Sequence, residues 1–172
     1  MANCLMLGFV LTIATIGVHA VGTAWWIGCL KRIARVPGKE SKRFLPLRVL
    51  CATAVLLLSL HLIEVAIWAG AYRVLPLDRP FSTLEEATYF STVTFASLGY
   101  GDIVITGPWR LLSAIQAMNG LLVFGWSTAL LFAVVERIWS DQEKHADDSR
   151  ANDSSGEDSV DDDASPDRRL AA

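Results

Sequence analysis

The stretch PFSTLEEATYFSTVTFASLGYGD, residues 80–102, decides the fold of this chain. It starts as a helix, because Pro80 precedes it and Ser82 and Glu85 have the spacing of a capping box. A helix over 83–96 would be about 21 Å long, too short to cross a bilayer. Two glycines near the end of the stretch then permit backbone angles that are closed to other residues. A half-length helix followed by a glycine-containing return is typical of a segment that enters a membrane and turns back.

The chain on either side of this stretch is apolar enough to lie in a membrane. It has 172 residues, of which 52% are hydrophobic and 19% are charged, whereas a soluble domain usually carries about a quarter charged residues. Runs over 1–30, 49–72 and 111–135 contain a single charged residue, Glu64, and each exceeds the roughly 20 residues that cross a bilayer as a helix. The sequence predicts an all-α membrane protein with three transmembrane helices and a re-entrant helix and loop. We expect no enzymatic activity.

The first apolar run, residues 1–30, has a second interpretation. Val18-His19-Ala20 loosely resembles the cleavage site of a signal peptide, but no Lys or Arg precedes the run and its length favours a transmembrane helix. The basic loop that follows, residues 31–48, contains seven basic residues and one acidic residue. Such a loop is cytoplasmic by the positive-inside rule, which leaves the N-terminus and the re-entrant segment outside and the C-terminus inside.

The last part of the chain has a different composition. From Asp141 onward it holds eleven acidic and four basic residues and no hydrophobic periodicity. Such a segment buries too little apolar surface to offset its ordering entropy, so residues 139–172 are predicted to be a disordered, acidic cytoplasmic tail. A second interpretation makes the tail an electrostatic regulator that draws cations toward the inner face.

The glycine-containing segment resembles the selectivity filter of potassium channels. It reads Thr94-x-x-Ser97-x-Gly99-Tyr100-Gly101-Asp102, where that family usually has Thr-x-x-Thr-x-Gly-Tyr-Gly-Asp. Three further features resemble the family: the aromatic pair Tyr89-Phe90, the start of the inner helix at Trp109-Arg110-Leu111, and Gly120 near the gating-hinge glycine. The resemblance implies a two-helix pore domain over 49–138, with a pore helix at 83–96 and a filter at 97–102.

The resemblance also implies roles for individual residues. In the family, backbone carbonyls of the filter replace the hydration shell of K⁺, and the corresponding residues are Ser97, Leu98, Gly99, Tyr100 and Gly101. One chain offers one oxygen per layer, so the resemblance implies a homotetramer in the lipid bilayer. Asp102 would concentrate cations at the outer mouth, and the cavity or gate would be lined by Gly120, Leu121, Phe124, Thr128 and Phe132. We expect K⁺ as the permeant ion, no cofactor and no nucleic-acid partner.

Three departures from the family pattern leave alternatives open. Ser97 keeps the hydroxyl of the usual Thr but lacks its methyl group, and Leu98 replaces Val or Ile. Val93 stands where some members place a carboxylate that braces the filter Asp, so Asp102 is expected to lack that partner. A weakly selective cation channel on the same scaffold and a non-conducting subunit are therefore alternatives to a potassium channel.

The gating signals in the sequence are few. No helix carries Arg or Lys at every third position, which argues against a voltage sensor. We expect a leak-like or filter-gated channel. Because no domain beyond the pore is evident, we expect the plasma membrane, and in particular the inner membrane of a prokaryote.

His61 and Glu64 are three residues apart on one face of the second apolar run, and His19 on the first run could lie near their level. Ionisable residues inside a membrane rarely face lipid. Three interpretations stay open: a hydrogen-bonded structural pair, a pH sensor and a metal site. A function of another class, a membrane cytochrome b subunit with His19 and His61 as haem ligands, would leave the re-entrant segment unexplained.

Overall fold

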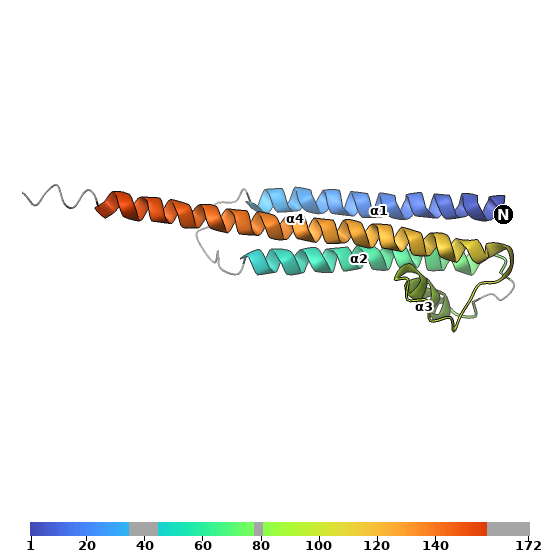
Figure 1. The fold of residues 1–172 in the computed structure, drawn as a ribbon. Helices are drawn as coiled ribbons and strands as arrows, with labels where there is room; N and C mark the ends of the chain where they lie inside the picture. Colours follow the sequence, from blue (N-terminus) through green and yellow to red (C-terminus); the bar gives the residue numbers. More distant parts are fainter. Residues whose placement is uncertain (35–44, 78–80, 158–172) are drawn as a thin grey trace, which may run out of the picture. The chain divides into compact units, whose positions relative to one another are not determined.

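The computed structural model describes residues 1–34, 45–77 and 81–157, and side chains within residues 1–32, 46–77 and 81–140. These ranges contain helices and no strand, which confirms the all-α prediction (Figure 1). In chain order the elements are α1 (Ala2–Ala34), α2 (Leu45–Val74), α3 (Leu84–Phe95), a 3₁₀ turn η1 (Gly107–Trp109) and α4 (Arg110–Glu157).

The chain divides into two compact units, Met1–Leu131 and Phe132–Ala172. The first unit holds α1, α2, α3 and the beginning of α4, and the second holds the rest of α4. Three helices are long and apolar enough to cross a membrane, over Ala2–Arg32, Pro46–Val74 and Gly107–Ser140. The prediction of three membrane-spanning helices is confirmed.

The helices are longer than the apolar runs that predicted them. The expected basic loop 31–48 is helical at both ends, since α1 reaches Ala34 and α2 starts at Leu45; residues 35–44 lie outside the described residues. The prediction of disorder from residue 139 is wrong as far as Glu157, where α4 ends. A helix already formed by a membrane span elongates without a new nucleation step, and the sequence after 141 is rich in helix-forming Ala, Glu, Lys and Gln. Residues 158–172 of the tail also lie outside the described residues.

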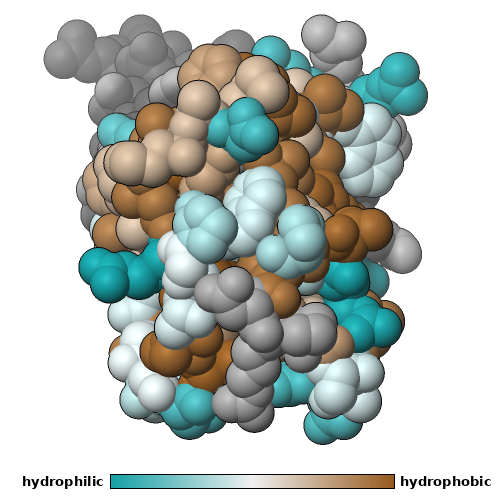
Figure 2. Space-filling model, turned by 90° about the vertical axis from the view of Figure 1, so that its right-hand side faces the viewer, coloured by the Kyte–Doolittle hydropathy of each residue, from teal (hydrophilic) through white to brown (hydrophobic). Residues whose placement is uncertain are grey.

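In the first unit, polar side chains connect the long helices. Asn119 of α4 donates from Nδ2 to Thr15 Oγ1 of α1 at 2.8 Å. Trp26 of α1 donates from Nε1 to Thr53 Oγ1 of α2 at 2.9 Å. Lipid tails are as apolar as leucine, so association of helices in a membrane relies on such hydrogen bonds and on close packing. The N-terminal end of this unit, which also carries α3 and the loop after it, exposes both hydrophilic and hydrophobic residues (Figure 2).

The N-terminus of α3 corrects one detail of the sequence analysis. The capping residue is Thr83, whose hydroxyl accepts from the backbone N–H of Glu86 at 3.1 Å. In return, Glu86 Oε2 accepts from the backbone N–H and the hydroxyl of Ser82. The predicted box of Ser82 and Glu85 is therefore displaced by one residue. Both pairs have the same spacing in the sequence, so spacing alone did not distinguish them.

Helix α3 is held by α2 and α4 together. Ser91 donates from its hydroxyl to the carbonyl of Val65 at 2.8 Å, and Gln116 of α4 donates to that same hydroxyl at 2.8 Å. Gln116 Oε1 also accepts from the Tyr72 hydroxyl of α2 at 2.9 Å. Buried aromatic rings fill the space around these bonds: Trp68, Tyr72, Phe81 and Phe90.

Gly120 of α4 lies against the C-terminal end of α3. A Cβ atom at this position would lie 1.9 Å from the backbone oxygen of Phe95, which no side-chain rotation could relieve. Helix α4 continues through Gly120 without a break. Close packing is therefore sufficient to explain this glycine, and its role as a gating hinge stays a prediction.

We predict that Gly120→Ala destabilises the protein by about 1–3 kcal/mol, the usual cost of overpacking. The measurement is thermal unfolding of the detergent-solubilised protein followed by circular dichroism. Gly17→Ala in α1 is the matched control, because no atom lies within 4 Å of a Cβ placed there; it should be neutral or slightly stabilising, since Ala is the better helix former. Equal stability of the two variants would contradict the close approach of α4 to α3.

Candidate functional site

The loop after α3 alternates in backbone handedness. Ser97 has a φ of 57°, Gly99 of 60° and Gly101 of 77°, whereas Leu98 and Tyr100 have negative φ. Residues of alternating handedness turn successive N–H groups to one side of the chain, and the carbonyls to the other. Glycine adopts positive φ without steric cost, but Ser97 does not. The signs of φ in this loop therefore follow the alternating pattern that a row of carbonyls on one side of a chain requires.

Two backbone hydrogen bonds connect this loop to the end of α3. The N–H of Ser97 donates to the carbonyl of Thr94 at 3.0 Å, and the N–H of Leu98 donates to that of Val93 at 2.9 Å. The chain therefore turns sharply at Ala96, which caps α3. These bonds fix where the loop begins relative to the helix.

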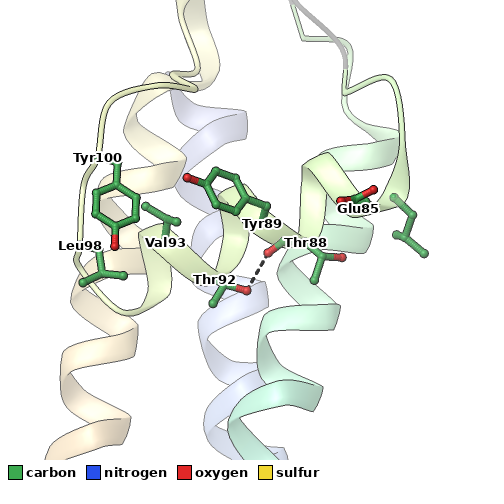
Figure 3. A pocket seen from close by; sticks show the side chains of 8 residues that line it. Glu85, Thr88, Tyr89, Thr92, Val93, Leu98 and Tyr100 are labelled. Carbon is green, nitrogen blue, oxygen red and sulfur yellow. Dashed lines mark hydrogen bonds between the residues drawn. The ribbon is translucent and has the colours of Figure 1, made fainter.

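The side chains of Leu98 and Tyr100 are 55% and 67% exposed in the single chain. Together with one face of α3 they line an open pocket of about 650 Å³, the α3–loop pocket (Figure 3). Its other residues are Leu84, Glu85, Thr88, Tyr89, Thr92 and Val93. The large side chains of the loop thus have no covering partner among the described residues of this chain.

Asp102 has a partner that the sequence analysis did not foresee. Its Oδ2 accepts a hydrogen bond from the Tyr89 hydroxyl of α3 at 2.8 Å. Position 93 supplies no carboxylate to Asp102, as expected, but Tyr89, one helical turn before Val93 on the same helix, holds Asp102 instead. The hydrogen bond to Asp102 raises the pKa of Tyr89, because a phenolate would face the carboxylate. The hydroxyl therefore keeps its proton, and the bond to Asp102, through the neutral range.

The predicted cavity residues of α4 fall into different environments. Gly120 is buried against α3, whereas Leu121, Phe124 and Thr128 are exposed in the single chain. Phe132, which belongs to the second unit, is exposed as well. The structure thus leaves most of the predicted cavity side chains without a covering partner within the chain, and their role stays a prediction.

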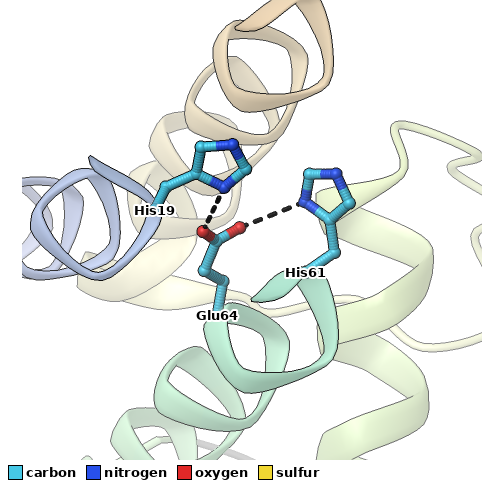
Figure 4. A group of neighbouring side chains, drawn as sticks. All are labelled: His19, His61 and Glu64. Carbon is cyan, nitrogen blue, oxygen red and sulfur yellow. Dashed lines mark hydrogen bonds and ion pairs between the residues drawn. The ribbon is translucent and has the colours of Figure 1, made fainter. Parts of the chain in front are cut away.

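A buried cluster of ionisable residues joins α1 and α2 (Figure 4). His19 of α1 contacts Glu64 Oε1 through Nδ1 at 2.9 Å, and His61 of α2 contacts Glu64 Oε2 through Nδ1 at 3.2 Å. His19 and Glu64 are completely buried and His61 is 8% exposed. The suspected hydrogen bond between His61 and Glu64 is present, and His19 does lie at their level.

Ser127 of α4 closes the cluster on its far side. Its Oγ lies 3.0 Å from His61 Nε2 and 3.3 Å from His19 Nε2. The contact of Ser127 with the histidines was not predicted from the sequence, because a serine in an apolar run is also the small residue that close helix packing favours. Its spacing from the buried Gln116, Asn119 and Val123 along α4 was the available signal.

The arrangement of the two imidazoles does not fit a haem. Their rings are stacked with centroids 5.4 Å apart and planes inclined by 25°, and both point a nitrogen at the same carboxylate. Axial ligands must direct their nitrogens at each other across the macrocycle. One donor atom from each of His19, His61 and Glu64 lies within 4.8 Å of the others, a spacing that a single ion could bridge, but these side chains already satisfy one another by hydrogen bonds.

Comparison with known proteins finds a family match for the part of the chain that contains α3 and the loop after it. Residues 60–137 match the model of a family described as ion channel. The chain is also 30% identical, over 128 residues, to an uncharacterized membrane protein, YdjJ, of Bacillus subtilis (strain 168), in an alignment that covers 67% of this chain. The chain spans about a third of that relative, 35% of its length. No solved structure matches.

We predict that Tyr89→Phe loosens the loop that carries Asp102, because the carboxylate loses the hydroxyl that holds it to α3. Amide hydrogen exchange in a peptide covering residues 97–105 should become a few-fold faster, as measured by mass spectrometry of the protein in detergent. Thr92→Val is the control, since that hydroxyl bonds only within α3, to the carbonyl of Thr88. Unchanged exchange in Tyr89→Phe would mean that the bond does not restrain the loop.

Proposed function

Because residues 60–137 match the model of a family described as ion channel, we propose that this multi-pass membrane protein is a potassium-selective channel. In this proposal the backbone of residues 97–101 forms the filter and replaces the hydration shell of K⁺. The observation that carries the proposal is the alternation of positive φ at Ser97, Gly99 and Gly101. This alternation supports a row of carbonyls on one side of the loop.

A single chain cannot surround an ion with one row of carbonyls, so the proposed channel is a homotetramer around a four-fold axis. The exposed Leu98 and Tyr100 support this assembly. An uncovered leucine and tyrosine in the α3–loop pocket are apolar surface that a neighbouring copy would bury. Leu121, Phe124, Thr128 and Phe132 of α4 would line the inner cavity of the assembly.

Asp102 has two tasks in the proposed channel. Its carboxylate would attract cations to the outer mouth, and its bond to Tyr89 would hold the outer end of the filter against α3. We assign the channel to the plasma membrane with the N-terminus outside and the C-terminus in the cytoplasm, on the strength of the basic residues in 31–48. Gating would be leak-like or at the filter.

The first test is the reversal potential of the purified protein in a planar bilayer with potassium on one side and sodium on the other. We expect a reversal near the potassium equilibrium potential and block by barium. A reversal near zero would overturn potassium selectivity in favour of a weakly selective cation channel, to which the missing methyl group of Ser97 would then have contributed. Absence of current from the homomeric protein would indicate a non-conducting subunit.

We predict that Gly99→Ala abolishes the potassium-selective current. Alanine at a φ of 60° is strained, and relief of that strain would turn the peptide plane and its carbonyl. Gly70→Ala in α2 is the control, since this glycine is helical and no atom lies within 4 Å of a Cβ placed there. A selective current of normal size from Gly99→Ala would count against residues 97–101 as the filter.

A further inference from the structure

The cluster of His19, Glu64, His61 and Ser127 forms a closed ring of four hydrogen bonds. Glu64 joins the two imidazoles through its two oxygens and their Nδ1 atoms. Ser127 joins the same two imidazoles through its hydroxyl and their Nε2 atoms. Both nitrogens of each ring are therefore engaged, and so are both oxygens of the carboxylate.

This ring of four hydrogen bonds needs one hydrogen more than its four side chains supply when both imidazoles are neutral and the carboxylate is ionised. Four hydrogen bonds need four hydrogens. The serine hydroxyl supplies one, each neutral imidazole supplies one, and an ionised carboxylate supplies none. With three hydrogens, one of the four contacts would bring two lone pairs together, which is costly for buried groups.

We propose that these four side chains form a binding site for a single additional proton, shared by the ring as a whole. With that proton bound, one imidazole donates from both nitrogens, to Glu64 and to Ser127. Ser127 then donates to the second imidazole, which donates in turn to Glu64. Movement of the proton from one histidine to the other changes neither the number of bonds nor the number of hydrogens, so the proton titrates with the histidine pair rather than with one residue.

The charge of the ring supports the same proton count. Glu64 and one imidazolium together are neutral, whereas the ring without the proton leaves a net negative charge completely buried in the membrane. A second bound proton would leave a net positive charge instead.

The groups around the ring of His19, Glu64, His61 and Ser127 come from every helix packed against it. Helix α1 contributes His19, α2 contributes His61, and α4 contributes the hydroxyl of Ser127, which is not titratable in this range. The nearest ring from α3 is the uncharged Phe95, with its centroid 6.1 Å from that of His61. No other ionisable side chain among the described residues with placed side chains forms a hydrogen bond or ion pair with Glu64.

The ring lies beside the base of the proposed filter, so binding of the proton should affect the channel. This part of the inference rests on the proposed function. His61 contacts the Phe124 ring of α4 with centroids 4.6 Å apart, and Phe124 contacts Phe95, which ends α3 just before the filter. Without the proton, both imidazoles donate to the charged carboxylate, which is the stronger acceptor, so one Nε2 faces the Ser127 oxygen with no hydrogen between them. Ser127 lies on the same helix as Phe124. Release of the proton should therefore loosen α4 from α1 and α2 beside the base of the filter.

The proton count can be measured by nitrogen-15 NMR of histidine-labelled full-length protein in liposomes at pH 8 with EDTA. His145→Ala serves as the background, because it leaves only the two ring histidines. Free histidine titrates near pH 6.5, so two ordinary histidines at pH 8 give about equal numbers of protonated and bare nitrogens. The ring predicts about three protonated nitrogens for each bare one.

Glu64→Gln is the matched variant. Glutamine keeps the shape of the side chain, and its amide group brings the missing hydrogen covalently. The ring can then close with four hydrogen bonds, no net charge and no extra proton, so this variant should fold. We expect its protonated and bare nitrogens to be about equal in number at pH 8.

Each NMR outcome decides the proposal. A ratio of about three in the His145→Ala protein that falls to about one with Glu64→Gln supports it. A ratio of about one before the change, or complete protonation of all ring nitrogens, overturns the single-proton count. A ratio that stays at about three in Glu64→Gln shows that the proton is held elsewhere and overturns it as well.

Bilayer currents test the link to the channel separately. Across the pH at which the NMR ratio changes, the current of the protein with Glu64 should change, and that of Glu64→Gln should not. A current that is independent of pH despite the expected NMR result overturns the coupling to the filter and leaves the proton site standing. Absence of current from both proteins speaks against the proposed function, and the NMR ratio still decides the proton site.

Discussion

A polar side chain inside a bilayer has no water to bond, and this constraint governs how the helices of this protein pack. Several buried polar residues of α1, α2 and α4 bond to one another across the helix interfaces. Asn119 bonds to Thr15, Gln116 bonds to Tyr72, and Ser127 bonds to both histidines of the ring. A shift of α4 by one turn would leave several of these groups unpaired at once. The polar contacts therefore set the register of helices whose apolar surfaces alone would slide freely.

The same register positions the loop after α3, which the proposed function makes the filter. Gln116 bonds to Ser91 in the middle of α3, and Gly120, one turn further along α4, lets that helix touch the last residue of α3. The loop starts two residues later, so its depth in the membrane follows from where α4 lies against α2. The proposed filter would depend on where its carbonyls lie, and α3, from which the loop starts, is held against α4 by the hydrogen bond of Gln116 and by the missing side chain of Gly120.

Much of this arrangement could be predicted from the sequence. The features that depend on composition or on a motif were predicted, and those that depend on tertiary packing were not. Long uncharged runs predicted the three transmembrane helices because hydropathy depends only on composition. The resemblance to potassium-channel filters and the glycines at 99 and 101 predicted where the chain turns back. The partners of Asp102 and of the two histidines were harder to predict, because Tyr89 and Ser127 reach them through tertiary packing rather than through spacing. Helical structure beyond residue 140 was not predicted, because the composition of that segment gives no sign that it continues a helix begun in the membrane span.

Helix α1 lies outside the matched ion-channel residues 60–137, yet it is part of the same buried network. Without His19, one oxygen of the completely buried Glu64 would have no partner, and an unpaired carboxylate at membrane depth is far costlier than an apolar residue. Without Glu64, the two histidines would in turn face an apolar gap. The buried carboxylate without the histidines, or the buried histidines without the carboxylate, would be costly there. Helix α1 and Glu64 of α2 therefore depend on each other. An added helix that served only as an anchor would need no ionisable residue, and the presence of His19 at the level of Glu64 indicates that α1 belongs to the working core of the protein.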